Sequence, residues 1–406
     1  MRDILEDAKS LQETIVEDRR VLHQIPEVGM YLPESVAYLE KRLTEMDIPY
    51  RRCGVLPEEI RQKYVAMGFP YMEGATGLVA TIVSGSPCFL LRADFDALPM
   101  GEINDLPFCS QRPNAAHMCG HDTHAAMLLG AAKLLKDRES QLKGTVKLMF
   151  QPGEEMGYGS KTMVDDGLLE NPRVDAAMGI HIFSTVESGT LQYFTGIASS
   201  SLDTFSFQIQ GRGGHSSTPE QTVDPMMIAS QIYTAANLMM TREVSPMVTA
   251  TLSGILHSGT AANIIPDTAQ LQFGLRTYNK EARAHVLQRL PELAEGYAKA
   301  WRGSVELSAF NCPCTYCDAG VTQALLPTVR RVMGAQRVSE SPPMSGTEDF
   351  SYVAEAVPST FLLLGAGAPG NYPHHNTRMT LDESVFHLGA ALHASCAMDW
   401  LAAHSE

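Results

Sequence analysis

The stretch "PCFLLRADFDALPM", residues 87–100, is a short apolar run that leads directly into two aspartates. A run of this kind predicts a buried strand. The stretch "HMCGHDTHAAM", residues 117–127, comes next and opens "AAMLLGAAKLLKD", residues 125–137, in which apolar residues recur at helical spacing. The order of strand, polar loop and helix indicates an α/β fold.

The same order recurs along the chain. Three further apolar strands lead into metal-binding or acidic side chains: "GTVKLMFQPGEE" (144–155) ends in two glutamates, "VDAAMGIHIF" (174–183) carries His181 at its expected end, and "STFLLLGAG" (359–367) precedes a loop with His374 and His375. Open α/β sheets place their sites past the carboxyl ends of strands. We therefore expect a catalytic domain with a metal site at this edge of the sheet.

Residues 186–306 have a different pattern, typical of half-exposed strands. Four alternating segments are "GTLQYFTG" (189–196), "LDTFSFQIQ" (202–210), "PMVTATLSG" (246–254) and "DTAQLQFGLRTY" (267–278), with helical stretches at 224–240 and 280–301. A ββαββα-like order predicts a small α+β domain inserted between residues 1–185 and 307–406 of the catalytic domain. Pro291 should kink or interrupt the second helix.

Composition excludes several classes of protein. The 406 residues are 44% apolar and 19% charged, as in ordinary globular proteins, and they exceed the usual size of a single core. A net charge of −15 without a long basic stripe argues against a nucleic-acid partner. No apolar run approaches the roughly 18 residues of a membrane span, and the charged N-terminal stretch is unlike a signal peptide. Eight cysteines are few for a disulfide scaffold, so we expect a cytoplasmic protein.

Strong ligand types at the predicted strand ends form one constellation. Its five members are Cys119, His121, Glu155, His181 and His375. Thiolate, imidazole and carboxylate together suit Zn²⁺, Mn²⁺, Co²⁺ or Ni²⁺. Five ligands exceed the needs of one catalytic zinc, so two divalent ions that share a bridging group are expected.

The start of the helix near residue 120 allows a plainer interpretation. Asp122 or Thr123 could cap this helix by accepting a bond from a free N–H group, and the nearby histidines could be structural. For His117 and His124 the structural interpretation is the favoured one.

The pair Glu154–Glu155 follows an apolar strand directly. Adjacent residues of a loop can diverge, so Glu155 can bind metal while Glu154 takes a proton from the attacking water and passes it to a leaving amine. The alternative is a solvated acidic turn. Asp94 and Asp96 could orient a ligand imidazole from behind.

Eight motifs in the same order resemble those of the M20 metallopeptidase superfamily. They are "RRVLHQIPEVG", "LRADFDALPM", "HMCGHDTHAAMLLGAA", "QPGEE", "GRGGHSSTPE", "GTAANIIPD", "SGTEDFSY" and "HHN…LDES". The similarity runs from about residue 15 to the C-terminus and is greatest to the aminoacylase, hippurate hydrolase and auxin-conjugate hydrolase branch. It implies a mixed-sheet catalytic domain with two metal ions and an inserted ferredoxin-like lid and dimerisation domain.

The resemblance also implies roles for individual residues. The five ligand types fall on the metal ligands of the family, and Glu154 falls on its general base. His375 rather than His374 has the spacing of the family's ligand, although Thr377 stands where proline is usual. In the inserted domain, the resemblance implies that His215 contacts the substrate, in many relatives across a dimer interface. Asn263 and Arg276 are implied to hold the substrate carboxylate.

Two segments depart from the pattern of the family. Residues 51–75 are longer than usual and could shape the mouth of the pocket or an interface. "CPCTYC", residues 312–317, replaces a proline-rich turn. A zinc ribbon would need a fourth ligand that is not evident nearby, so buried or free cysteines are favoured. Glu348 and Asp349 lie in a family motif without an assigned role.

These observations predict a metal-dependent amidohydrolase that cleaves N-acyl amino acids and forms a homodimer or a larger homo-oligomer. One alternative is a dipeptidase or carboxypeptidase on the same scaffold. Another is a catalytically silent metal-binding regulatory protein, but an inactive relative has little reason to keep Glu154 together with the ligands.

Overall fold

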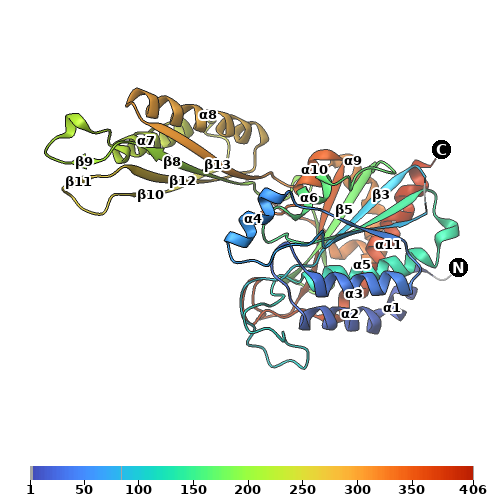
Figure 1. Cartoon of the computed structure of the whole chain (residues 1–406). Coiled ribbons are helices and arrows are strands. Elements are labelled where there is room, and N and C mark those ends of the chain that lie inside the picture. The colour runs from blue at the N-terminus through green and yellow to red at the C-terminus, as the bar shows by residue number, and fades with distance from the viewer. Residues whose placement is uncertain (1–2, 84, 406) are drawn as a thin grey trace. The chain divides into compact units, whose positions relative to one another are not determined.

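The computed structural model describes residues 3–83 and 85–405, and its internal contacts divide into two units. The first unit comprises Met1–Ala198, Thr315–Pro343 and Asp349–Glu406, and the second comprises Ser199–Cys314 and Met344–Glu348. Each unit has its own sheet and its own hydrophobic core (Figure 1).

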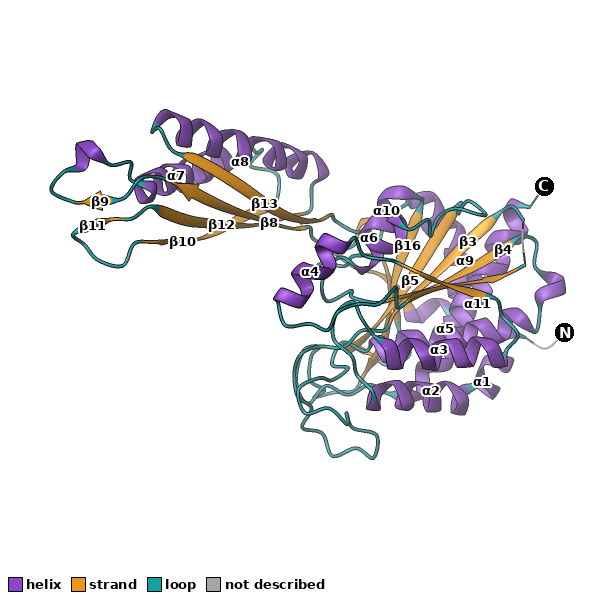
Figure 2. Ribbon diagram, in the orientation of Figure 1, coloured by secondary structure: helices purple, strands orange, loops and turns teal. Residues whose placement is uncertain are grey.

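The sheet of the first unit is mixed, as predicted. Within the described residues it has eight strands in the order β1-β2-β4-β3-β5-β16-β6-β15. The central strands β4, β3, β5 and β16 are parallel to one another, whereas β1, β2 and β6 each pair antiparallel with a neighbour (Figure 2). Every residue of β3, β4 and β16 is buried, as expected for strands covered on both faces. The bounds are β1 Tyr50–Cys53, β2 Gly77–Ile82, β3 Cys88–Asp94, β4 Thr145–Gln151, β5 Ala176–Glu187, β6 Leu191–Tyr193, β15 Val338–Glu340 and β16 Ser359–Gly367.

Helices pack against this sheet and against one another. α5 and α11 contact each other and both contact β3, while α2 and α3 pack on α5 (Figure 1). The helices of this unit are α1 Ile4–Ser10, α2 Gln12–Gln24, α3 Pro33–Glu45, α4 Glu58–Ala66, α5 His121–Lys136, α6 Gly159–Asp165, α9 Ala319–Met333, α10 Ser351–Ala356 and α11 Phe386–His404. None of the helices in the described ranges is long and apolar enough to span a bilayer.

The start of α5 differs from the predicted cap. The N-cap residue is Gly120, at φ +89°, a conformation that glycine adopts without strain, and no side chain caps the helix from that position. Asp122 lies inside the first turn, where its Oδ1 accepts the N–H of Thr123 at 2.9 Å. Its other oxygen bonds Arg19 and His23 of α2, so Asp122 joins two helices instead of serving as the N-cap.

β5 does not end at His181 as predicted. It continues to Glu187, because its parallel pairing with β16 extends past the pair His181–Leu363. His181 therefore lies within the strand, and residues before and after it are paired with β16.

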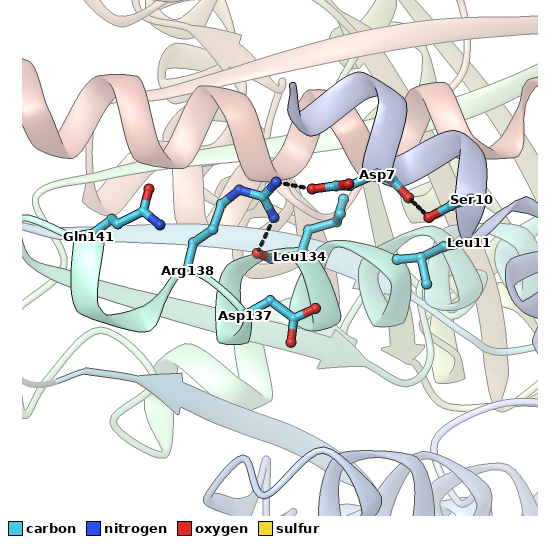
Figure 3. A pocket seen from close by; sticks show the side chains of 7 residues that line it. All are labelled: Asp7, Ser10, Leu11, Leu134, Asp137, Arg138 and Gln141. Carbon is cyan, nitrogen blue, oxygen red and sulfur yellow. Dashed lines mark hydrogen bonds and ion pairs between the residues drawn. The ribbon is translucent and has the colours of Figure 1, made fainter. Parts of the chain in front are cut away.

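The N-terminal helix α1 is anchored on the far end of α5. A shallow pocket of about 290 Å³ lies between them, and Arg138 reaches across it to bond Asp7 (Figure 3). The same guanidinium donates to the carbonyl of Leu134 at 3.2 Å, and the hydroxyl of Ser10 donates to the carbonyl of Asp7 at 2.6 Å. These bonds give the pocket a structural role.

The second unit has a four-stranded antiparallel sheet, in the order β10-β12-β8-β13, covered by α7 and α8. The elements are β8 Leu202–Gln210, α7 Pro225–Arg242, β10 Ala250–Ser258, β12 Thr268–Thr277, α8 Lys280–Ala300 and β13 Ser304–Cys312, with a small ribbon of β9 Gly214–His215 and β11 Ile264–Ile265. Their order along the chain is βαββαβ.

One expectation for this region was wrong, and a second was wrong in part. The stretch "GTLQYFTG" forms β6 and β7 of the first unit, because β6 pairs with β15 and β16, and β7 (Gly196–Ile197) pairs with β14 (Tyr316–Cys317). The ββαββα order is therefore replaced by βαββαβ. Pro291 does not interrupt α8, whose buried residues Val286, Leu290, Ala294 and Ala298 continue through the proline on the face that meets the sheet.

Candidate metal centre

The candidate site lies in the first unit, where residues from five segments meet. Asp94 ends β3 and Asp96 follows it, Cys119 and His121 stand at the start of α5, Glu154 and Glu155 lie in the turn after β4, His181 lies in β5, and His375 follows β16. Ligand-type atoms of Cys119, Glu155 and His375 lie within 4.8 Å of one another, as do those of His121, Glu154 and Glu155. Glu155 belongs to both groups, so the structure brings these residues into one cluster.

Two histidines direct Nε2 toward the cluster. His121 Nδ1 lies 3.2 Å from Asp96 Oδ1, so Nδ1 carries a proton and Nε2 faces Asp94 and Glu154. Burial opposes protonation of His121, but Asp94 raises the pKa of its imidazole above the usual value. His181 Nδ1 donates to the carbonyl of Ile182 at 2.7 Å, and its Nε2 lies 3.6 Å from Cys119 Sγ. These bonds assign both rings the tautomer that binds a metal through Nε2.

Two other histidines nearby lack a free lone pair. His124 Nε2 accepts the N–H of Ile182 at 2.8 Å, and His374 Nε2 accepts the N–H of Ser184 at 2.9 Å. Burial lowers the pKa of both rings, that of His374 to about 3, so both are neutral and their protons reside on Nδ1. Although His374 lies close to Cys119, this tautomer leaves no nitrogen to bind a metal, whereas His375 is not restricted in this way.

The two glutamates of the turn after β4 have different neighbours. Glu154 Oε2 lies 4.0 Å from His121 Nε2, while Glu155 Oε1 lies 3.2 Å from His375 Nε2. Burial opposes ionisation of Glu155, but His375 and His121 hold the pKa of this carboxyl below its usual range. The bond to Glu155 raises the pKa of His375. His375 adopts φ +62°, a strained conformation for a residue other than glycine.

Asp94 and Asp96 connect the cluster to the sheet. Asp96 faces His121 with one oxygen and accepts the N–H of Glu155 with the other, at 3.0 Å. Asp94 Oδ1 lies 2.5 Å from His124 Nδ1, and Asp94 Oδ2 lies 3.7 Å from His121 Nε2. Both carboxylates are buried, so β3 fixes the position of the first turn of α5.

The donor set fits a divalent cation. Burial raises the pKa of the Cys119 thiol to about 12, and a bound cation is the kind of charge that holds a thiol as thiolate at neutral pH. His121 Nε2 is buried and has no hydrogen-bond partner among the described residues. An unpaired buried polar atom costs about 1–3 kcal/mol, and a bond to a metal ion would remove that cost.

The remaining predicted residues lie in the second unit. His215 is exposed on β9, and its Nδ1 accepts the N–H of Ser217 at 3.0 Å, so Nε2 carries the proton. β9 pairs with β11, which follows Asn263 directly. Arg276 lies on β12 and donates to the hydroxyl of Thr347 at 3.0 Å.

Some features of the site region were not predicted from the sequence. The stretch "SGTEDFSY" was singled out without a role, but its Asp349 is fully buried against Arg92 and Gln151. His23 in "RRVLHQIPEVG" bonds Asp122 beside the candidate ligand His121. In both cases the partners are far apart in sequence, so periodicity could not pair them. The three clustered cysteines, Cys312, Cys314 and Cys317, are all buried.

Known proteins show a clear relationship. Residues 90–399 match the model of peptidase family M20/M25/M40, so the chain belongs to this family and the resemblance seen in the motifs is confirmed. An N-acetyl-L-cysteine deacetylase of Bacillus subtilis is 33% identical over 379 residues, which cover 93% of this chain and 85% of that protein. Thermostable carboxypeptidase 1 of Saccharolobus solfataricus is 32% identical over 402 residues, covering 97% and 96%.

A solved structure supports the same relationship. The YXEP protein of Bacillus subtilis, described as a dinuclear metal binding peptidase from the M20 family, matches with a TM-score of 0.74 at 28% identity, over 97% of this chain and 99% of that chain. The protein is thus an enzyme that hydrolyses amide bonds, and its family indicates divalent metal ions, for which the residues around Cys119 are candidate ligands.

Proposed function

We propose that the enzyme cleaves N-acyl amino acids to a carboxylic acid and a free amino acid. The observation that supports this most is the pair of Nε2 atoms, on His121 and His181, that face a buried thiol and two carboxylates. The similar deacetylase is named for N-acetyl-L-cysteine, which is an N-acyl amino acid.

In this proposal the five ligand types hold two divalent ions. The proposed ligands are Cys119, His121, Glu155, His181 and His375. Zn²⁺, Mn²⁺, Co²⁺ and Ni²⁺ all suit this mixture of thiolate, imidazole and carboxylate. When bound, the ions polarise the scissile carbonyl and lower the pKa of the attacking water. Asp96 and Asp94 orient the imidazole of His121.

Glu154 has the position of a general base. Its carboxylate lies beside His121 Nε2 but is not needed as a ligand, because Glu155 fills that role. Glu154 takes a proton as water attacks the amide carbonyl, and it then delivers a proton to the leaving nitrogen. Its place on a turn at the end of a buried strand keeps this carboxylate close to the ligands.

The second unit, which replaces the expected range 186–306 by Ser199–Cys314 and Met344–Glu348, is proposed to serve as a lid and dimerisation domain. The βαββαβ order and the strand order β10-β12-β8-β13 support a ferredoxin-like fold for it. His215 presents Nε2–H as a donor, which suits the oxyanion of the tetrahedral intermediate. Arg276 and Asn263 bind the carboxylate of the amino acid.

The edge strand β10 supports a homodimer. One of its edges pairs with β12 and the other has no partner strand among the described residues. Ile255 and Leu256 of this strand are exposed, as is Leu238 of α7. A long exposed edge with apolar side chains is a template for pairing with a second chain. The eight cysteines, few for a disulfide scaffold of this length, support a cytoplasmic location.

A screen that varies the acyl group and the amino acid independently tests the proposal. The metal-replete enzyme should hydrolyse N-acyl amino acids and require a free carboxylate on the product amino acid. The similar carboxypeptidase favours a second candidate, an exopeptidase. Faster cleavage of dipeptides with a free amine than of matched N-acyl amino acids would establish that candidate instead. Metal-dependent binding without turnover across the panel would favour a regulatory protein.

A further inference from the structure

We propose that Asp349 is a positioning residue for the base, because its carboxylate holds both ends of the turn that carries Glu154 and Glu155. This inference rests on the proposed role of Glu154. It also gives a function to the motif "SGTEDFSY", which the proposed mechanism leaves unused.

The two oxygens of Asp349 bind on opposite sides of the turn. Oδ1 accepts from Gln151 Nε2 at 2.5 Å, and Oδ2 accepts the N–H of Ser160 at 2.9 Å. Gln151 is the last residue of β4, and Ser160 lies in the first turn of α6. All three residues are buried. One carboxylate therefore fixes where the strand ends and where the next helix begins.

The turn between these two points is tightly closed. Gly153 and Gly157 both adopt φ +66°, and the N–H of Gly157 donates to the carbonyl of Glu154 at 2.7 Å. A Cβ atom on Gly159 would lie 1.7 Å from the carbonyl oxygen of Pro152. Because the turn has no internal slack, a shift of either end moves the carboxyl group of Glu154 directly.

Arg92 orients this arrangement from the neighbouring strand. Its Nε donates to Gln151 Oε1 at 2.8 Å, which leaves Gln151 Nε2 to donate to Asp349. The same guanidinium lies 3.4 Å from Asp349 Oδ1 and 2.9 Å from Asp94 Oδ2. All of these side chains are fully buried. A buried charge without its partner is strongly unfavourable. The contacts of Arg92 therefore hold Gln151, Asp349 and Asp94 in fixed relative positions.

This connection predicts an effect on catalysis beyond stability. Asp94 faces His121 of the cluster, and Gln151 leads into the turn that carries the base. The network thereby fixes the base relative to the proposed ligands. A displacement of about 1 Å at a reacting group can cost about 10²-fold in rate.

An exchange of two side chains tests the proposal. Asp349→Asn turns an acceptor that faces Gln151 and Arg92 into a donor, while it leaves an oxygen for the N–H of Ser160. Adding Gln151→Glu keeps an acceptor for Arg92 Nε, supplies an acceptor for the new amide, and restores the net charge of the network. Asp318→Asn is the matched control, because Asp318 caps α9 and has no bond to the turn.

The readouts are kcat and KM at saturating metal, metal per chain, melting temperature, and hydrogen exchange in the peptide 151–160. Asp349→Asn should remain folded at the assay temperature, retain metal, lose at least tenfold in kcat with little change in KM, and exchange faster in 151–160. The double variant should recover most of the kcat and the protection. The Asp318 control should change neither.

Unchanged kcat in folded, metal-replete Asp349→Asn would overturn the proposal. A loss of kcat that the double variant with Gln151→Glu does not recover would also overturn it. If Asp349→Asn does not fold, Gln151→Met removes the same link from its other end, and normal kcat there would be equally decisive. Rates are compared with wild type on any amide that wild type cleaves. If the proposed substrate class is wrong, the comparison of kcat and of hydrogen exchange between the variants and wild type still tests the role of Asp349. Failure of the proposed function can therefore be distinguished from failure of this inference.

Discussion

At the scale of single residues, hydrogen bonds to the imidazole rings decide which histidines of the cluster can bind a metal. The N–H groups of Ile182 and Ser184 on β5 occupy the acceptor nitrogens of His124 and His374. His121 and His181 instead use Nδ1 to bond Asp96 and the carbonyl of Ile182, and both direct Nε2 toward the cluster. Histidine therefore has two functions in this cluster: two rings direct Nε2 toward the candidate ligands, and two accept backbone N–H groups of β5.

Removal of the thiol tests the ligand set at this scale. Cys119→Ala should lower the metal bound per chain, as measured by elemental analysis, and activity should fall with it, because a soft anionic ligand is lost. Cys396→Ala is the control, since Cys396 is buried in α11 away from the cluster. Full metal occupancy in Cys119→Ala would assign the cysteine a structural role.

At the scale of elements, a charge network attaches the start of α5 to α2. His23 Nδ1 lies 2.7 Å from Asp122 Oδ2, and His23 Nε2 lies 3.3 Å from Glu102 Oε2. Arg19 Nε lies 2.8 Å from the same oxygen of Asp122. Burial and Arg19 oppose protonation of His23, but Asp122 and Glu102 together raise the pKa of its imidazole above the usual value.

This raised pKa predicts how stability depends on pH. The stabilisation from protonated His23 is fully present below its unfolded pKa of about 6.5 and is lost as pH rises through the folded pKa. Urea unfolding should therefore show a larger destabilisation by His23→Gln at pH 6 than at pH 9. His285→Gln is the control, because its pair with Glu243 is exposed and worth little. A difference that grows toward alkaline pH would contradict this prediction.

Several elements were predictable from the sequence for local reasons. The apolar runs of β3, β4, β5 and β16 and the helical face of α5 are strong enough to specify their own type. The place of the segment "GTLQYFTG" in the fold could not be predicted in this way, because β6 has only three residues and is defined by its pairing with β15 and β16. In the candidate site, residue types at strand ends could be named, but hydrogen-bond partners such as Asp349 and Ser160 are 189 positions apart.

At the scale of the whole molecule, the proposed reaction needs groups from both units. The first unit carries the cluster and Glu154, and the second carries His215, Asn263 and Arg276. His215→Ala should leave metal content unchanged and lower kcat by about 10²–10³, the usual value of an oxyanion donor. Unimpaired turnover in this variant would remove His215 from the mechanism.

Mixed dimers determine which chain supplies the histidine. If His215 acts across a dimer interface, hybrids of His215→Ala and Glu154→Gln contain one site with both groups intact. Random exchange in an equal mixture of the two dimers should then restore about a quarter of wild-type activity. Each variant incubated alone is the control. Proven exchange of subunits without recovery would indicate that the histidine serves its own chain.

The most direct test of the proposed mechanism is the replacement Glu154→Gln, measured together with metal content. The amide keeps the size of the side chain and cannot accept the proton of the attacking water. The variant should bind as much metal as wild type and lose at least the factor of about 10²–10⁴ in kcat that a general acid–base group contributes. Near-normal kcat in the fully metal-loaded variant would contradict the assignment of Glu154 as the base.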